Sequence, residues 1–237
     1  MDFAGHLAVV TGATEGIGRA IAVALGRAGG TVAICARTDA KVRATVEALR
    51  QDGVDAIGAP CDVSDPEAVA AFAALVGRER GDARILVNNA GIARLAPLEQ
   101  LSLADWDAVM ATNVRSLFLV TRAFLPGLKR GGGGTIVNVA SLAGRNGFEE
   151  GTAYCASKHA VLGFSKALML EVRKHGVRVV AVCPGSVATA LMDQQRRFAP
   201  NRERILTPED VADAVIGTLA LPGRAMVSEL DLRPTNP

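Results

Sequence analysis

The sequence predicts an α/β fold in which a doubly wound, parallel, seven-stranded sheet carries helices on both faces. Three observations predict it: seven short apolar runs, longer amphipathic stretches between them, and a glycine-rich turn at the first junction of strand and helix. Most of the runs are apolar enough to be covered on both faces, which is typical of strands in a parallel sheet.

The seven apolar runs are the expected strands, and they alternate with segments long enough to form crossover helices. They cover residues 7–10, 31–35, 56–59, 85–87, 135–139, 177–182 and 226–232. Right-handed crossovers between such strands give a Rossmann fold, with the ligand crevice at the carboxyl ends of the strands.

Capping residues mark the starts of two of the crossover helices. Ser64 is the expected cap of a helix that carries Glu67 three residues later. Thr207 precedes Pro208, which suits the first position of a helix because proline has no N–H to leave unpaired.

The whole chain, residues 1–237, is expected to form one domain, because α/β folds of this length commonly have a single core. Hydrophobic residues make up 49% of the sequence and charged residues 21%, which excludes disorder for most of its length. The tract Gly131-Gly132-Gly133-Gly134 follows a long helix expected at residues 103–128. We interpret it as a helix stop and loop, not as a linker.

Charge and composition argue against a nucleic-acid or membrane partner. The sequence has 26 Lys and Arg against 24 Asp and Glu, and only 4% aromatic residues. The cluster Arg196-Arg197-Phe198 is interpreted as a solvated surface. The amino terminus has no basic n-region, and no apolar run approaches the length of a membrane span, which indicates a cytoplasmic protein.

Cysteines and histidines show no metal-binding pattern. The four cysteines have no C-x-x-C spacing and are expected to be buried free thiols: Cys35, Cys61, Cys155 and Cys183. The three histidines, His6, His159 and His175, are too dispersed for a ligand motif, so no metal is expected.

The first expected strand runs into a turn with three glycines, Gly12, Gly16 and Gly18, followed by a helical run. Glycine lets the backbone approach a pyrophosphate closely, and the start of a helix favours an anion. The alternative is a glycine-rich turn that binds nothing. The combination of strand, glycines and helix at one junction favours nucleotide binding.

The G-x-x-x-G-x-G spacing, with its leading Thr11, resembles the short-chain dehydrogenase/reductase family, including its 3-oxoacyl-ACP reductases. The resemblance covers nearly the whole chain. Three later segments are also similar to family motifs: Asp62-Val63, Asn88-Asn89-Ala90-Gly91 and Pro184-Gly185-Ser186-Val187-Ala188-Thr189. The resemblance implies that these segments border a nicotinamide dinucleotide. With the glycine turn, Arg37 and two residues of the proton-transfer site, the expected cofactor contacts are Gly12, Thr14, Glu15, Gly16, Ile17, Gly18, Arg37, Asp62, Val63, Asn89, Ala90, Gly91, Tyr154, Lys158, Pro184, Gly185, Val187 and Thr189.

The end of the second strand bears on the choice of cofactor. NAD-specific sites usually place an Asp or Glu there for the adenosine ribose, but this chain has Arg37. A guanidinium suits a 2′-phosphate, so NADP(H) is favoured over NAD(H). Glu15 opposes this choice, because a carboxylate in the turn repels a phosphate. NAD(H) therefore stays open as the alternative.

Tyr154 and Lys158 are four residues apart on one face of a helix expected at residues 152–175. An ammonium about 4 Å from the phenol stabilises the phenolate by up to about 4 kcal/mol at an effective dielectric constant of about 20. The tyrosine then becomes a workable acid and base. Ser141 follows the fifth strand, 13 residues before Tyr154, and Asn113 lies in the long helix. The resemblance implies that Ser141 binds the substrate oxygen and that Asn113 opens a water relay to Lys158.

The implied reaction passes hydride between NADP(H) and a carbonyl or secondary alcohol, with Tyr154 exchanging the proton. A non-catalytic dinucleotide-binding regulator and a sugar-nucleotide epimerase or dehydratase are the alternatives. The substrate stays open among 3-oxoacyl thioesters, small ketones and hydroxy acids. The residues expected to shape its pocket, beside a short lid at residues 191–207, are Leu142, Ala143, Arg145, Phe148, Val187, Leu191 and Met192.

Family resemblance also implies a homo-oligomer, a tetramer or dimer, built through the two long helices. The carboxyl-terminal residues 229–237 are expected to form a strand and a tail. They depart from the V-D-G-G ending common in the family, which leaves their role open.

Overall fold

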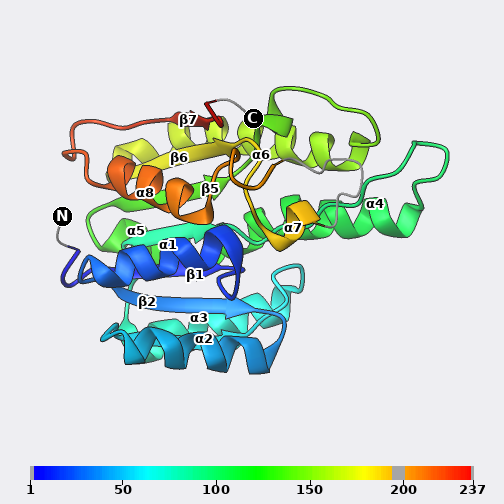
Figure 1. Ribbon diagram of the computed structural model, residues 1–237. Coiled ribbons are helices and arrows are strands. Elements are labelled where there is room, and N and C mark those ends of the chain that lie inside the picture. The colour runs from blue at the N-terminus through cyan, green and yellow to red at the C-terminus, as the bar shows by residue number, and fades with distance from the viewer. Residues whose placement is uncertain (1–2, 194–200, 236–237) are drawn as a thin grey trace.

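The computed structural model describes residues 3–193 and 201–235, and its centre is a seven-stranded sheet (Figure 1). The strands are β1 (Leu7–Thr11), β2 (Thr31–Ala36), β3 (Ala56–Pro60), β4 (Ile85–Asn88), β5 (Gly134–Val139), β6 (Val177–Pro184) and β7 (Glu229–Leu232). Their order is β3-β2-β1-β4-β5-β6-β7, and every neighbouring pair is parallel. The predicted doubly wound parallel sheet is confirmed.

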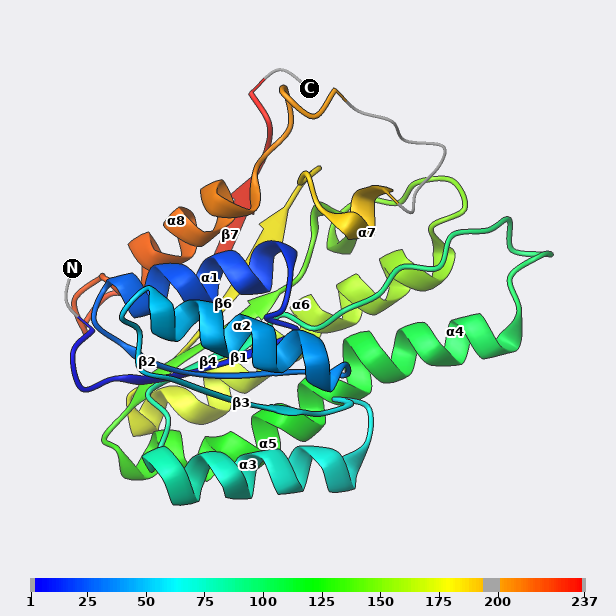
Figure 2. The same ribbon diagram turned by 60° about the horizontal axis from the view of Figure 1, so that its bottom comes forward.

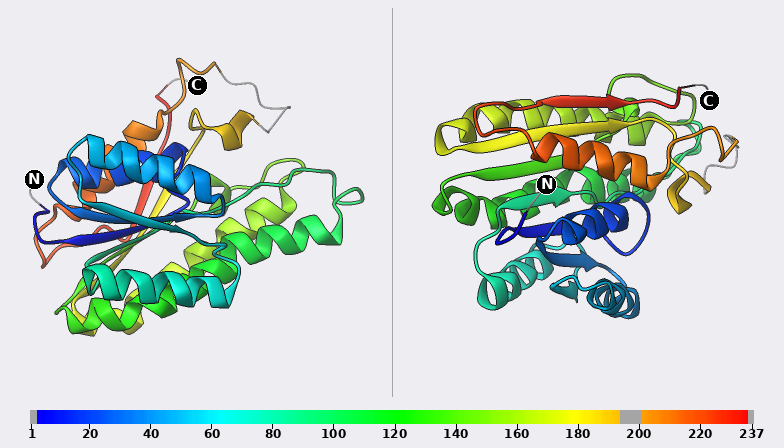
Figure 3. Two further views of the ribbon diagram at one scale, coloured as in Figure 1. Left: turned by 90° about the horizontal axis from the view of Figure 1, so that it is seen from below. Right: turned by 60° about the vertical axis from the view of Figure 1, so that its left-hand side comes forward.

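Helices cover the sheet in two layers. The helices are α1 (Gly16–Arg27), α2 (Asp39–Gln51), α3 (Pro66–Arg80), α4 (Leu103–Met110), α5 (Ser116–Arg130), α6 (Thr152–Val172), α7 (Ala190–Asp193) and α8 (Pro208–Leu219). One core cluster joins α1, α2 and α8 to one face, and a second joins α3, α5 and α6 to the other (Figures 2 and 3). The order in which strands are added to the sheet reverses between β1 and β4, which opens a crevice at their carboxyl ends.

Burial on both faces explains why the strands are apolar throughout. In β1, Val9 packs into the cluster beneath α3 and α5, while Val10 packs into the cluster beneath α1 and α2. Neither side chain is exposed to solvent. Successive side chains of a strand point to opposite faces, so a strand between two helical layers needs apolar residues at every position.

The predicted cap of α3 was assigned to the wrong residue. Asp65, not Ser64, accepts the N–H of Glu67, at 3.0 Å, and Pro66 takes the first helical position. Ser64 instead donates to Asp62, at 2.7 Å. A carboxylate next to the helix start outcompetes the hydroxyl one residue earlier because it also interacts favourably with the helix dipole.

The start of α8 agrees with the prediction. Thr207 accepts the N–H of Asp210, and Asp210 accepts the N–H of Thr207 in return, which forms a capping box with Pro208 inside it.

The long helix expected at residues 103–128 is interrupted by a π-helical turn, Ala111–Arg115, between α4 and α5. Together they form a helical rod of 28 residues whose most apolar stretch has a mean hydropathy of 1.2. By length and composition this rod is long and apolar enough to cross a membrane, contrary to the expectation that no run would be. Core helices of globular proteins have the same length and apolar composition, and α5 packs its apolar side on the sheet.

Several predicted ends shift by a few residues. The seventh strand begins at Glu229, not at residue 226, because the chain turns between Pro222 and Ala225 and pairs with β6 only from Glu229 onward. Helix α6 ends at Val172 and continues as a short 3-10 turn to His175. The four-glycine tract supplies a helix stop as predicted.

All four cysteines are buried and free, as expected.

Candidate functional site

A cavity of about 680 Å³ lies at the carboxyl ends of the strands. Its walls come from the turn after β1 and from segments that follow the other strands, β7 included, with α6 contributing two side chains. Of the expected cofactor contacts, all but one line this cavity: Gly12, Thr14, Glu15, Gly16, Ile17, Arg37, Asp62, Val63, Asn89, Ala90, Gly91, Tyr154, Lys158, Pro184, Gly185, Val187 and Thr189. The structure therefore brings together residues that lie far apart in the sequence.

The exception is Gly18, which does not line the cavity. A methyl group on Gly18 would lie 2.3 Å from Nδ2 of Asn89 and 2.5 Å from the carbonyl oxygen of Gly12. The glycine thus allows α1 to approach the loop after β4. Gly12 has a φ of +63° and faces Ala90 closely, so this position also needs a residue without a side chain.

Hydrogen bonds join the end of β1 to the end of β4. The hydroxyl of Thr11 accepts the N–H groups of Asn89 and Ala90, at 3.0 and 3.1 Å. Nδ2 of Asn89 donates to the carbonyls of Thr11 and Gly12, at 3.0 and 3.1 Å. These bonds fix the shape of the crevice at the point where the strand order reverses. Thr11 was noted as part of the motif but not as a site residue.

One end of the cavity carries several charged side chains. Arg37 and Lys41 both line it, and Lys41 donates to Glu15 at 3.0 Å. Burial raises the pKa of Asp62, but hydrogen bonds from Ser64 and then the positive charge of Arg37 outweigh it, so this pKa lies below its ordinary value. Lys41 was missed from the sequence, although its position one helical turn after Arg37 was a usable signal.

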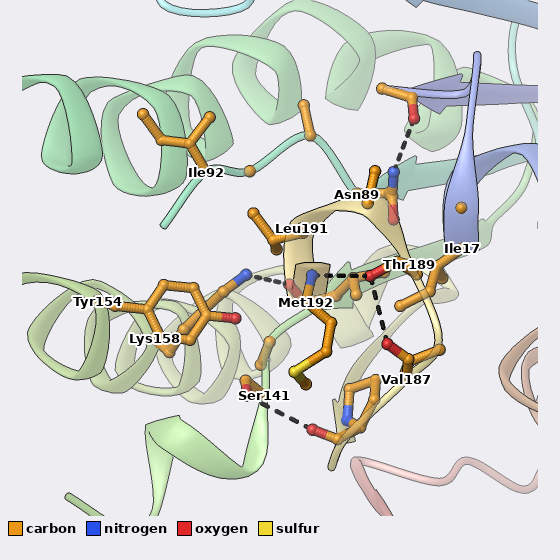
Figure 4. A pocket seen from close by; sticks show the side chains of 18 of the residues that line it. Ile17, Asn89, Ile92, Ser141, Tyr154, Lys158, Val187, Thr189, Leu191 and Met192 are labelled. Carbon is orange, nitrogen blue, oxygen red and sulfur yellow. Dashed lines mark hydrogen bonds between the residues drawn. The ribbon is translucent and has the colours of Figure 1, made fainter. Parts of the chain in front are cut away.

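Tyr154 and Ser141 face each other in the deeper part of the cavity (Figure 4). Tyr154 is buried, and burial raises its pKa, while its hydrogen bond with Ser141 opposes the shift. Ser141 also donates to the carbonyl of Pro184 at 3.4 Å and accepts the N–H of Ala143 at 3.1 Å. These contacts hold the serine hydroxyl beside the phenol.

Lys158 lies alongside Tyr154, with its ammonium 5.7 Å from the centre of the phenol ring. It donates to the carbonyl of Val139 at 2.9 Å, and burial lowers its pKa to about 8. The pKa of Tyr154 is therefore raised here, whereas the sequence argument expected the lysine to lower it. Burial is the dominant cause, and the ammonium is directed at a carbonyl.

Asn113 is buried in the π-helical turn and does not line the main cavity. It accepts the N–H of Ile92 at 2.8 Å and donates to the Ile92 carbonyl and to Ser157. A separate cavity of about 10 Å³ has both Asn113 and Lys158 in its wall. The π turn thus ties the helical rod to the loop after β4, as such turns often do near functional sites.

The expected substrate-pocket residues line the cavity with one exception: Leu142, Ala143, Phe148, Val187, Leu191 and Met192. Arg145 was wrongly assigned to this group. Its guanidinium turns to β7 and forms ion pairs with Glu229, at 2.5 Å, and Asp231, at 2.8 Å. Two carboxylates more than 80 residues later in the chain attract it away from the pocket, which its local sequence does not reveal.

Other residues of the cavity wall were not foreseen, among them Cys61, Ile92, Thr112, Asn146, Arg233 and Pro234. The cluster Arg196-Arg197-Phe198 and part of the expected lid lie outside the described residues. Within residues 3–193 and 201–235, no group of three His, Cys, Asp or Glu side chains is arranged to hold a metal ion.

Comparison with known proteins also indicates a dehydrogenase. A sequence profile described as short chain dehydrogenase matches residues 6–199. A protein assigned as the ketoacyl reductase of the monensin polyketide synthase of Streptomyces virginiae is 42% identical over 235 residues, which cover 91% of this chain and 90% of that protein. The 3-oxoacyl-(acyl-carrier-protein) reductase of Pseudomonas aeruginosa is 36% identical over 235 residues, which cover 96% and 95%.

The fold also matches a solved structure closely. A single-residue variant of actinorhodin polyketide ketoreductase, solved with NADPH, superposes with a TM-score of 0.90 at 35% identity, and the match covers 97% of this chain and 96% of that chain. Sequence profile, relatives and fold agree with the arrangement of the cavity. The chain belongs to the short-chain dehydrogenase family and resembles its 3-oxoacyl-(acyl-carrier-protein) reductases.

Proposed function

We propose that the protein transfers hydride between NADP(H) and a carbonyl or secondary alcohol substrate, with Tyr154 as the general acid and base. One observation carries this proposal: Ser141, Tyr154 and Lys158 line the same cavity as the glycine-rich turn after β1. A non-catalytic regulator would not require a serine hydroxyl, a phenol and an ammonium to converge there.

The residues of the cavity fit a nicotinamide dinucleotide phosphate. The turn after β1 offers backbone N–H groups and the start of α1 to a pyrophosphate. Arg37 and Lys41 offer two cations to a 2′-phosphate, and the ion pair with Lys41 reduces the repulsion that Glu15 exerts. When bound, the cofactor would supply or accept the hydride.

Tyr154 exchanges the proton in this mechanism. Burial keeps its pKa above the ordinary value, so the hydroxyl retains its proton at neutral pH. It can then donate that proton to the oxygen of a carbonyl that is being reduced. The Ser141 hydroxyl donates a hydrogen bond to the same oxygen, which stabilises the negative charge that develops there.

Lys158 and Asn113 support the proton transfer. With its pKa near 8, Lys158 is largely protonated at neutral pH and can bind ribose hydroxyls while remaining able to exchange its proton. The small cavity between Lys158 and Asn113 has about the volume that one water molecule needs. We assign to that water the relay of a proton to Lys158, which replaces the proton that Tyr154 donates during reduction.

Replacing Tyr154 with phenylalanine tests the reaction, because it removes only the hydroxyl. We expect carbonyl-dependent NADPH oxidation, followed by nicotinamide absorbance, to fall by at least about 100-fold, while NADPH binding is largely retained. Equal turnover by Tyr154→Phe and the unaltered protein would contradict the role of Tyr154. The same assay with NADH tests the cofactor, and a higher kcat/KM with NADH would contradict the preference for NADP(H).

We further assign the whole chain to one catalytic domain that acts in the cytoplasm as a homo-oligomer. Support for self-association comes from exposed apolar side chains on neighbouring helices, Leu103 of α4, Phe118 of α5 and Leu170 of α6.

A further inference from the structure

The segment after β7 brings a guanidinium to the part of the cavity that contains Ser141. The N–H of Gly185 donates to the carbonyl of Leu232 at 2.8 Å. A methyl group on Gly185 would lie 3.2 Å from Cδ1 of Leu142 and 3.3 Å from Cδ of Pro234. Arg233 lies in the chain between Leu232 and Pro234, the two residues in contact with Gly185, and it lines the cavity. It is therefore held beside the loop whose Pro184 carbonyl accepts a hydrogen bond from Ser141.

The acidic groups nearest in the sequence to Arg233 already have partners. Glu229 is paired with Arg145 at 2.5 Å and with Lys166 at 3.2 Å, and Asp231 is paired with Arg145 at 2.8 Å. These two carboxylates and two cations cancel in charge. Among the described residues no carboxylate forms an ion pair with Arg233, so its positive charge is uncompensated at the cavity wall.

The charge within the cavity is also unevenly distributed. Its described carboxylates are Glu15, in the turn after β1, and Asp62, after β3. Both belong to the end that Arg37 and Lys41 line. Around Ser141 the described wall is apolar or neutral, apart from Lys158 and Arg233, and the ammonium of Lys158 is bound to the Val139 carbonyl. Among the described residues, Arg233 is thus the cation available to a substrate at this end.

We propose that Arg233 determines substrate specificity by binding an oxyanion of the substrate, either a carboxylate or a phosphate. This inference rests on the carbonyl reduction proposed above and narrows its substrate class to oxo acids and to ketones or thioesters that carry a phosphate. A guanidinium presents a planar array of N–H donors that matches both oxyanions, and it stays charged at any relevant pH. Its contribution concerns binding, because Arg233 supplies no proton to the reacting carbonyl.

Matched substrate pairs test this assignment in Arg233→Gln, with Arg224→Gln as the control. Arg224 is exposed in the loop before β7 and does not line the cavity. The carboxylate pair is 3-oxobutanoate and its methyl ester. The phosphate pair is acetoacetyl-coenzyme A and acetoacetyl-N-acetylcysteamine, which share the thioester. We expect Arg233→Gln to raise the KM for the charged substrate of one pair about 10- to 100-fold. The kcat for that substrate and the KM for its neutral partner should change little. Which pair responds identifies the oxyanion.

A binding measurement keeps this inference separate from the reaction itself. Butanoate, its methyl ester, and pantetheine with and without its phosphate are titrated into the NADP⁺-loaded protein and followed by ligand-observed NMR. Binding of one anion that is lost in Arg233→Gln and kept in Arg224→Gln would support the role of Arg233 even if no carbonyl were reduced. Equal binding of anions by both variants and the unaltered protein, or equal losses for charged and neutral substrates, would overturn it.

Discussion

At the scale of single residues, the site depends on two ionisable side chains whose pKa values burial shifts in opposite directions. Burial disfavours the charged form of each group, so it raises the pKa of Tyr154 and lowers that of Lys158. Tyrosine is thereby kept as a proton donor, and lysine is brought to a pKa of about 8, close to working pH. An exposed lysine at the same spacing would lack this lowered pKa.

The burial of Lys158 predicts a particular dependence of stability on pH. Its pKa is about 8 in the folded protein and about 10.4 in an unfolded chain, so between these values the unfolded state binds more protons. The free energy of unfolding should therefore rise with pH in this window, by up to about 3 kcal/mol from this group. Urea unfolding between pH 8 and 10 measures it, as the difference between the unaltered protein and Lys158→Met.

Subtracting the Lys158→Met curve removes the other groups that titrate in the same range. Tyr154 and Cys183, whose pKa values are raised, contribute in the opposite direction in both proteins, because their stabilising effect is lost as pH rises. Lys174→Met, in an exposed turn, is the matched control and should show no such difference. A difference that stays flat or falls between pH 8 and 10 would refute the assignment.

At the scale of elements, the close approach of α1 to the loop after β4 sets the shape of the nucleotide end. That approach requires the missing side chain at Gly18, since Asn89 and the Gly12 carbonyl fill the space. Hydrogen bonds that Asn89 donates to Thr11 then fix the loop after β4 to the end of β1. The helix start is consequently held where a pyrophosphate can reach its N–H groups.

Substituting alanine for Gly18 should therefore destabilise the fold and weaken NADPH binding. The added methyl group forces Asn89 or the Gly12 backbone to move, and such overpacking costs about 1–3 kcal/mol. Gly77→Ala is the matched control, because nothing lies within 4 Å of a methyl group there and Gly77 is within α3. That variant should gain up to about 1 kcal/mol. Urea unfolding measures the stability of each variant, and NADPH titration measures its affinity for the cofactor. Equal stability of the two variants would contradict this account.

At the scale of the whole molecule, the sheet places the site and leaves a helical surface free. The cavity lies where the strand order reverses between β1 and β4, while α3, α5 and α6 cover one face of the sheet and α4 extends past the ends of the strands (Figures 2 and 3). Leu103 is 75% exposed and Leu170 is 56% exposed, which a single chain in water does not favour. We expect a second copy to cover these side chains.

Mass measurement by light scattering tests the assembly. We expect the unaltered protein to have the mass of a dimer or tetramer, and Leu103→Glu combined with Phe118→Glu to lower it, because buried charges oppose association. Ala40→Glu introduces the same charge on α2, in the opposite layer, and should leave the mass unchanged. A monomeric mass for the unaltered protein, or a mass that the double substitution does not change, would exclude this surface.

The sequence by itself determined the parallel sheet, the sites of most turns and most of the residues that line the nucleotide end of the cavity. These features depend on local patterns: runs of apolar residues between turns, glycines at a strand end, and a tyrosine one helical turn before a lysine. Parallel topology then places every strand end at the same edge, so residues such as Asp62 and Asn89 meet without any further information.

Tertiary structure alone decided which distant side chains meet and how burial changes their chemistry. Arg145 turns to Glu229 and Asp231 across the sheet, and Arg233 reaches the cavity through the contact of Leu232 with Gly185. The raised pKa of Tyr154 likewise follows from burial, which outweighs the opposing hydrogen bond with Ser141. Ion pairing and desolvation depend on distances through space, and spacing along the chain does not determine those distances.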